Sequence, residues 1–134
     1  TNRQIVPWST VFDFFAQRLH LTLARAQLLK KILPDAPFFV LPAPPPIPSA
    51  EHIYGHPEIF DFKVHKLQPA EFRLKIHTVF VEAQTQIARA VNGQMLHPPS
   101  WALDPQGFLA EEFWHGCTHA NPAYYSRLFN EMGI

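Results

Sequence analysis

The sequence has little of three features that would assign it to a class at once: cysteine, excess charge of one sign, and long apolar runs. Its single cysteine, Cys117, cannot form an internal disulfide, so a disulfide framework is excluded. Its 11 basic and 11 acidic side chains balance to a formal net charge of zero, so we expect neither nucleic acid nor an anionic membrane surface as a partner. Charged residues and histidine interrupt the longest apolar stretches, so none is expected to span a bilayer.

The amino end shows no signal-peptide pattern. The chain starts with Thr1 rather than methionine, so we interpret the start as a cut or processed end. For the compartment we slightly favour the cytoplasm. With 134 residues, of which 47% are hydrophobic, the chain should form one globular domain with its own core.

Apolar residues recur three or four positions apart in three stretches, which is the periodicity of helices. These stretches are residues 11–33, 69–91 and 122–132. Ser9 or Thr10 can cap the start of the first. Asn92-Gly93 suits the end of the second, and Asn121 can cap the third.

Two shorter apolar runs have the character of strands. Residues 37–41 lie between prolines in the pattern of a strand buried on both faces, and residues 94–96 form a minimal strand. The order of helices and strands predicts an α/β domain with parallel strands joined by right-handed crossovers. The segments after the two strands, residues 42–48 and 97–121, should flank one crevice at the carboxyl edge of the sheet.

The proline run at residues 42–48, which includes Pro44, has two interpretations. It has the composition of a polyproline ligand for an SH3-type partner. It also adjoins an expected buried strand and has no flanking basic residue, so we favour a stiff extended loop. Residues 49–68 are expected to form a long, partly helical loop, of the kind that is more often functional than idle.

The stretch from Trp114 to Tyr125 combines two histidines, the cysteine and the start of the last helix. His119 should lie in a loop just before that helix. A histidine held there can take or give a proton near neutral pH. The simpler alternative is a partly buried loop histidine whose ring is satisfied by backbone groups.

Thr118-His119-Ala120-Asn121, with Gly107-Phe108-Leu109 before it and a tyrosine pair after it, resembles the last conserved block of the SGNH (GDSL-like) hydrolases. The likeness is to a bacterial branch whose block reads Asp-x-Thr-His-Ala-Asn. Further matching positions, in the same order, are Phe12-Asp13-Phe14, residues 41–46 and Phe72-Arg73-Leu74-Lys75. The resemblance covers nearly all of this chain but only the C-terminal part of the family domain. It implies a three-layer, flavodoxin-like α/β architecture with a parallel sheet, of which residues 1–134 would be an incomplete portion.

The same resemblance implies a serine ester hydrolase that acts on small-molecule or carbohydrate esters without a cofactor or metal. His119 would be its general base. No Gly-Asp-Ser motif occurs in the 134 residues, so the nucleophile would lie in a segment absent from this chain. Asn2 would be the last trace of the family's Gly-x-Asn oxyanion block. The family's acid falls on Gly116, which has no carboxylate.

Several side chains around this block are expected to line the site. They are Pro44, Trp101, Trp114, His115 and Cys117. In the simpler alternative the tryptophans are core residues around a loop, and Arg73 and Lys75 belong to a solvated helix face.

Two other functions stay open. Gly116 in place of the acid fits a catalytically inactive binding or interaction module. His115, Cys117 and His119, with His52 or His56, could also hold zinc, although no established ligand spacing accompanies them.

Overall fold

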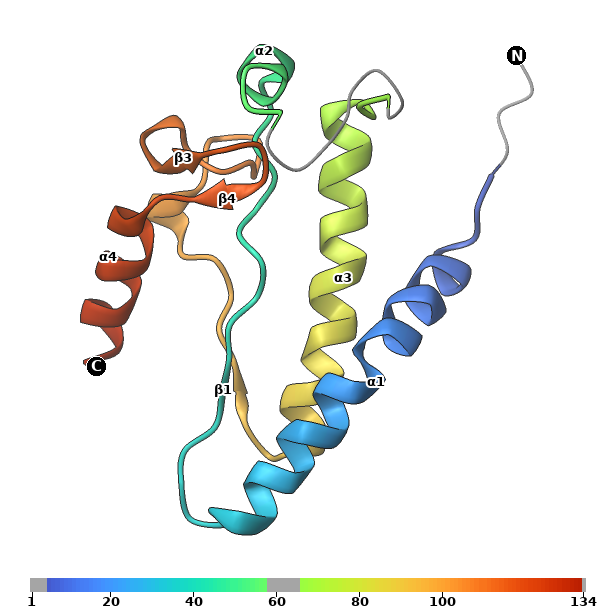
Figure 1. The fold of residues 1–134 in the computed structure, drawn as a ribbon, viewed down its shortest axis with the longest axis vertical. Helices are drawn as coiled ribbons and strands as arrows, with labels where there is room; N and C mark the ends of the chain where they lie inside the picture. Colours follow the sequence, from blue (N-terminus) through green and yellow to red (C-terminus); the bar gives the residue numbers. More distant parts are fainter. Residues whose placement is uncertain (1–4, 58–65, 134) are drawn as a thin grey trace. The chain divides into compact units, whose positions relative to one another are not determined.

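The computed structural model describes residues 5–57 and 66–133 (Figure 1). The chain divides into two compact units. The first consists of Thr1–Pro42 and Thr78–His97, and the second of Ala43–His77 and Pro98–Ile134. Asn2 lies outside the described residues, so its expected role in an oxyanion block stays a prediction.

The first unit contains helix α1 (Trp8–Ile32), strand β1 (Phe39–Val40), most of helix α3 (Ala70–Ala90) and strand β2 (Gln94–Met95). The two strands pair in parallel, with Phe39 opposite Gln94 and Val40 opposite Met95. α3 connects them along the chain, so the predicted parallel pairing is confirmed. The predicted helices at residues 11–33 and 69–91 correspond to α1 and α3.

The implied three-layer, flavodoxin-like parallel sheet is wrong. In residues 5–57 and 66–133 the sheets are two-stranded, one parallel and one antiparallel, and helices predominate. The expected burial of β1 on both faces is also wrong, because Phe39 is 44% exposed. Pro42 has no N–H and cannot extend the ladder, so the pairing stays too short to carry layers of helices.

The core of the first unit forms where α1 meets the end of α3 and the strand pair. Its buried residues are Ala26, Ile87 and Val91, with Leu19, Leu23, Phe38 and Val40 packed against them. Phe15 and Phe80 add a ring contact at 5.0 Å between centroids. α1 starts at Trp8 after Pro7 without a side-chain cap, so the expected cap at Ser9 or Thr10 is wrong. The Pro7 carbonyl accepts from the Thr10 and Val11 N–H groups at 3.1 and 3.4 Å, so backbone groups alone start the helix.

The predicted end of α3 at Asn92-Gly93 is confirmed. Asn92 takes a left-handed conformation (φ 51°), and the Gly93 N–H donates to the Ala88 carbonyl at 2.8 Å. A Cβ on Gly93 would lie 2.7 Å from the Phe38 carbonyl oxygen. Glycine therefore allows the two strands to approach closely enough to pair.

The second unit contains α2 (Ala50–Tyr54), the first turns of α3, and a C-terminal region of short elements. These are the 3₁₀ helices η1 (Ser100–Ala102) and η2 (Glu111–Phe113), the strands β3 (Trp114–His115) and β4 (His119–Ala120), and α4 (Pro122–Met132). Ser49 caps α2, because its hydroxyl accepts from the His52 N–H at 3.1 Å. α4 has the predicted bounds, and the Asn121 side chain accepts from the Tyr124 N–H at 3.2 Å, as predicted.

Side chains of α3 hold the proline segment, which we define as residues 43–48. Arg73 donates to the carbonyls of Ile47 (2.6 Å) and Pro48 (3.1 Å), and His77 donates to the Ala43 carbonyl at 2.9 Å. The expectation that Arg73 lies on a solvated helix face is therefore wrong. Prolines offer carbonyls but no N–H groups, so the partners of this segment must be donors.

The proline segment belongs to the core of the second unit. Pro45 and Ile47 are buried, and the Pro46 carbonyl accepts from the Leu109 N–H at 3.3 Å. The favoured stiff loop agrees with this burial better than a free SH3 ligand does. None of the helices in the described residues is long and apolar enough to cross a membrane.

Candidate functional site

The candidate site is a small antiparallel hairpin just before α4, formed by β3 and β4. Trp114 lies opposite Ala120, and His115 lies opposite His119. Gly116 opens the three-residue connection in a left-handed conformation with φ 55°. The sequence predicts only a loop here, because two residues per strand are too few for an alternating pattern.

His119 is exposed on β4. Its Nδ1 lies 3.3 Å from the Thr118 hydroxyl oxygen, and its Nε2 has no hydrogen-bond partner among the described residues. If Nδ1 carries the proton and donates it to the hydroxyl, Nε2 is left with a free lone pair. The ring then has the form that a general base needs.

The hairpin register brings His115 next to His119. Residues directly opposite each other in an antiparallel pair point to the same face, with Cβ atoms about 5 Å apart. His115 is exposed as well. The two side chains therefore extend to the same face of the hairpin from different strands.

Gly116 leaves an open position where the family has its acid. An added Cβ there would meet no atom within 4 Å. Asparagine and aspartate are the side chains that best tolerate a left-handed backbone. An aspartate at Gly116 would therefore meet no clash, although every residue with a side chain is strained at this positive φ, so the test needs a second variant with the same strain.

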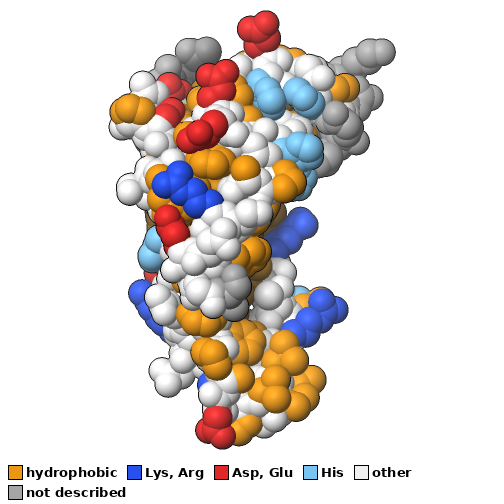
Figure 2. All heavy atoms as spheres, turned by 90° about the vertical axis from the view of Figure 1, so that its left-hand side faces the viewer, with side chains coloured by type: hydrophobic (Ala, Val, Ile, Leu, Met, Phe, Trp, Pro, Cys, Tyr) orange, Lys and Arg blue, Asp and Glu red, His pale blue; other side chains and the backbone are white. Residues whose placement is uncertain are grey.

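Helix α2 supports the hairpin through His52, whose Nε2 donates to the Gly116 carbonyl at 2.9 Å. The His52 ring also lies 5.1 Å from the Trp114 ring and 4.3 Å from the His56 ring, measured between centroids. Several histidine side chains lie close together in the upper part of the face drawn in Figure 2, and others lie apart from them. The sequence suggests His52 and His56 only as extra metal ligands and gives no sign of this support, because the contact joins residues 64 positions apart.

The two tryptophans expected at the site both hold neighbouring segments together. The Trp114 ring N–H donates to the Leu109 carbonyl at 2.7 Å. Trp101 packs edge-on against Phe113 and donates its ring N–H to Glu131 at 2.8 Å. Both side chains are half-buried, so the simpler assignment of these residues to packing around a loop accounts for their contacts.

Tyr124 lies at the centre of this aromatic packing and is 1% exposed. Its hydroxyl is buried and has no hydrogen-bond partner among the described residues. Burial, with a smaller contribution from Tyr125, raises the pKa of the Tyr124 hydroxyl to about 12. The hydroxyl therefore stays protonated at neutral pH.

The zinc alternative finds no support in the geometry. Cys117 is only 2% exposed, whereas His115 and His119 are exposed. Within residues 5–57 and 66–133, no three His, Cys, Asp or Glu side chains come together in a way that could hold a metal ion.

Pro44, which was also expected to line the site, is half-buried in the proline segment.

Comparisons with protein-family models, curated proteins and solved structures find no match to this chain. The resemblance to the SGNH hydrolases therefore rests on the residues around His119 and on the matching positions upstream.

Proposed function

We propose that this chain carries the general-base part of a serine ester hydrolase, with His119 as the base. The observation that carries this function is the state of the His119 ring: it is exposed, Nδ1 is next to the Thr118 hydroxyl, and Nε2 is unoccupied among the described residues. Support comes from the motif and the hairpin rather than from the fold, because the described residues do not form the parallel sheet of that family.

In the proposed reaction a serine from a segment outside these 134 residues attacks the ester carbonyl. His119 Nε2 takes the hydroxyl proton as the new C–O bond forms, and it returns the proton to the leaving alcohol when the tetrahedral intermediate collapses. Water repeats the sequence on the acyl enzyme and releases a carboxylic acid. The Thr118 hydroxyl can accept from Nδ1 when Nδ1 carries the proton, but it provides no negative charge for the imidazolium.

Two variants of the natural full-length protein test the base. His119→Gln should lower kcat/KM for p-nitrophenyl acetate by about 10²- to 10⁴-fold, because the proton transfer is lost. His20→Gln is the matched control, since it removes an exposed histidine outside the hairpin and should leave the rate near wild type. Equal losses in the two variants, or no loss in His119→Gln, would refute the role of His119.

A second candidate function is a catalytically inactive binding module. Gly116 favours it, because no described carboxylate lies within ion-pair distance of His119. Losing the acid of a triad costs on the order of 10⁴-fold in rate. A protein that kept the scaffold without the acid could bind esters without turning them over.

Substitution at Gly116 separates the two functions. Gly116→Asp should raise the esterase rate of a weakened enzyme by at least about tenfold, because the carboxylate stabilises the imidazolium. Gly116→Asn has the same size and the same tolerance of the left-handed backbone but no charge, so it should not raise the rate. If neither the wild type nor Gly116→Asp turns over the ester, the binding module is supported instead.

A further inference from the structure

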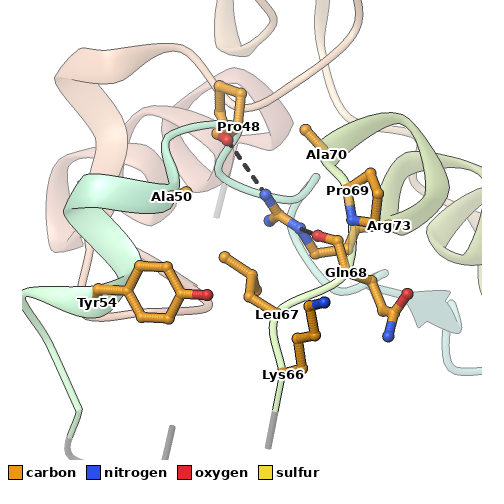
Figure 3. Close-up of a pocket in the computed structure, with 9 residues that line it drawn as sticks. All are labelled: Pro48, Ala50, Tyr54, Lys66, Leu67, Gln68, Pro69, Ala70 and Arg73. Carbon is orange, nitrogen blue, oxygen red and sulfur yellow. Dashed lines mark hydrogen bonds between the residues drawn. The ribbon is translucent and has the colours of Figure 1, made fainter.

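An open pocket of about 470 Å³ lies between α2 and the start of α3, within the second unit (Figure 3). Its lining residues are Pro48, Ala50, Tyr54, Lys66, Leu67, Gln68, Pro69, Ala70 and Arg73. None of them belongs to the hairpin that carries His119. The volume is in the range of small-molecule sites, which is about 300–1,000 Å³.

The charged side chains that line this pocket have one sign. Lys66 and Arg73 are cationic, and no carboxylate is among the lining residues. No described carboxylate lies within ion-pair distance of either cation. Lys66 is exposed, whereas Arg73 is partly buried and interacts electrostatically with Glu71, which does not line the pocket. The lining of the pocket therefore presents positive charge and no carboxylate.

Arg73 is held in place for such a role by the backbone. Its Nε donates to the Gln68 carbonyl at 3.1 Å, and its two terminal nitrogens donate to the Ile47 and Pro48 carbonyls. A guanidinium has five N–H groups, so these three bonds leave two. Burial lowers the pKa of Arg73, and Glu71 acts in the opposite direction, but a guanidinium stays charged at any physiological pH.

The rest of the lining is mostly apolar. Pro48, Leu67 and Pro69 supply aliphatic surface, and the Tyr54 side chain extends from α2 with its hydroxyl directed towards Leu67 (Figure 3). Ala50 and Ala70 are small and leave room. Such a surface suits an apolar chain better than a fully hydrated ion such as phosphate.

We propose that this pocket binds a small carboxylate with a short apolar chain. The carboxylate accepts hydrogen bonds from the two remaining Arg73 N–H groups and lies near the Lys66 ammonium, while the chain covers Leu67 and the prolines. This binding uses other residues than the ester hydrolase function and does not depend on it.

Backbone amide shifts of the ¹⁵N-labelled chain test this binding, with sodium butanoate, butan-1-ol and inorganic phosphate as probes at constant ionic strength. Butanoate should shift the amides of residues 66–73 in a saturable way with a millimolar dissociation constant. Butan-1-ol lacks the charge and phosphate lacks the chain, so both should bind more weakly. Phosphate binding as tight as butanoate binding, or no saturation with butanoate, would overturn the proposal.

Charge variants locate the site. Lys66→Gln should weaken butanoate binding by about fivefold, the size expected for a partly exposed ion pair. Lys75→Gln is the matched control, because Lys75 is exposed on α3 and does not line the pocket. Equal weakening in the two variants would show that only the general field of the protein attracts the anion. His119→Gln should leave the titration unchanged, so its outcome separates this site from the proposed base.

Discussion

Replacing Arg73 by methionine should release the proline segment from α3. Methionine keeps the unbranched stem but removes all three hydrogen bonds to the carbonyls of Ile47, Pro48 and Gln68. Ile47 is only 1% exposed, so water cannot easily replace its partner, and an unpaired buried carbonyl costs about 1–3 kcal/mol. The other two bonds are closer to solvent and contribute about 0.5–1 kcal/mol each. The free energy of unfolding should therefore fall by about 3 kcal/mol.

Urea unfolding measures this loss. The fluorescence of Trp101 and Trp114 reports on the second unit, where both residues lie. Lys75→Met is the matched control, because it makes the same kind of change at an exposed position of α3 and should stay within about 0.5 kcal/mol of wild type. Arg73→Lys should recover less than half of the loss, since one ammonium cannot reach three carbonyls in a fixed plane. An Arg73→Met protein as stable as the control would refute the reasoning, and full recovery in Arg73→Lys would show that charge matters rather than geometry.

Two further predictions concern pH. Burial lowers the pKa of His77 against the opposing effect of its bond to the Ala43 carbonyl, so the unfolded chain binds the proton more readily. The contribution of His77 to the free energy of unfolding should be complete above pH 6.5 and should fall as the pH drops below that value. Urea midpoints taken from neutral to acidic pH should depend less on pH in His77→Gln than in the wild type. An unchanged pH dependence would contradict the assignment. The pKa of Tyr124 is raised to about 12, mainly by burial, so its stability contribution is complete below pH 10 and is lost as the pH rises towards 12. Tyr124→Phe should remove that alkaline loss, which is about 3 kcal/mol in the free energy of unfolding, and should leave the stability at neutral pH unchanged. If the variant is less stable than the wild type by more than about 1 kcal/mol at neutral pH, the hydroxyl has a hydrogen-bond partner after all.

The helices could be predicted from local signals. Asn121 caps α4 and Asn92-Gly93 ends α3 as the sequence predicts, because a cap depends only on neighbouring backbone groups. The parallel pairing of β1 with β2 was also predictable, since the crossover helix between them favours it. The family-based fold class was wrong, because the number of strands in a sheet depends on pairings between distant segments that short apolar runs do not specify.

The hairpin, the support from His52 and the Arg73 contacts all depend on how distant segments pack. The residue types were visible in the sequence, and so was the motif around His119. The residues next to an arginine in the sequence are the same whether its side chain is solvated or donates to three carbonyls, as Arg73 does. The sequence alone therefore suggested a solvated face for Arg73. Local sequence determines which backbone groups lack partners, here the carbonyls of the proline segment. The path of the chain in three dimensions then determines which donors reach those carbonyls, because a side chain can satisfy a buried carbonyl only where packing brings it within hydrogen-bond distance.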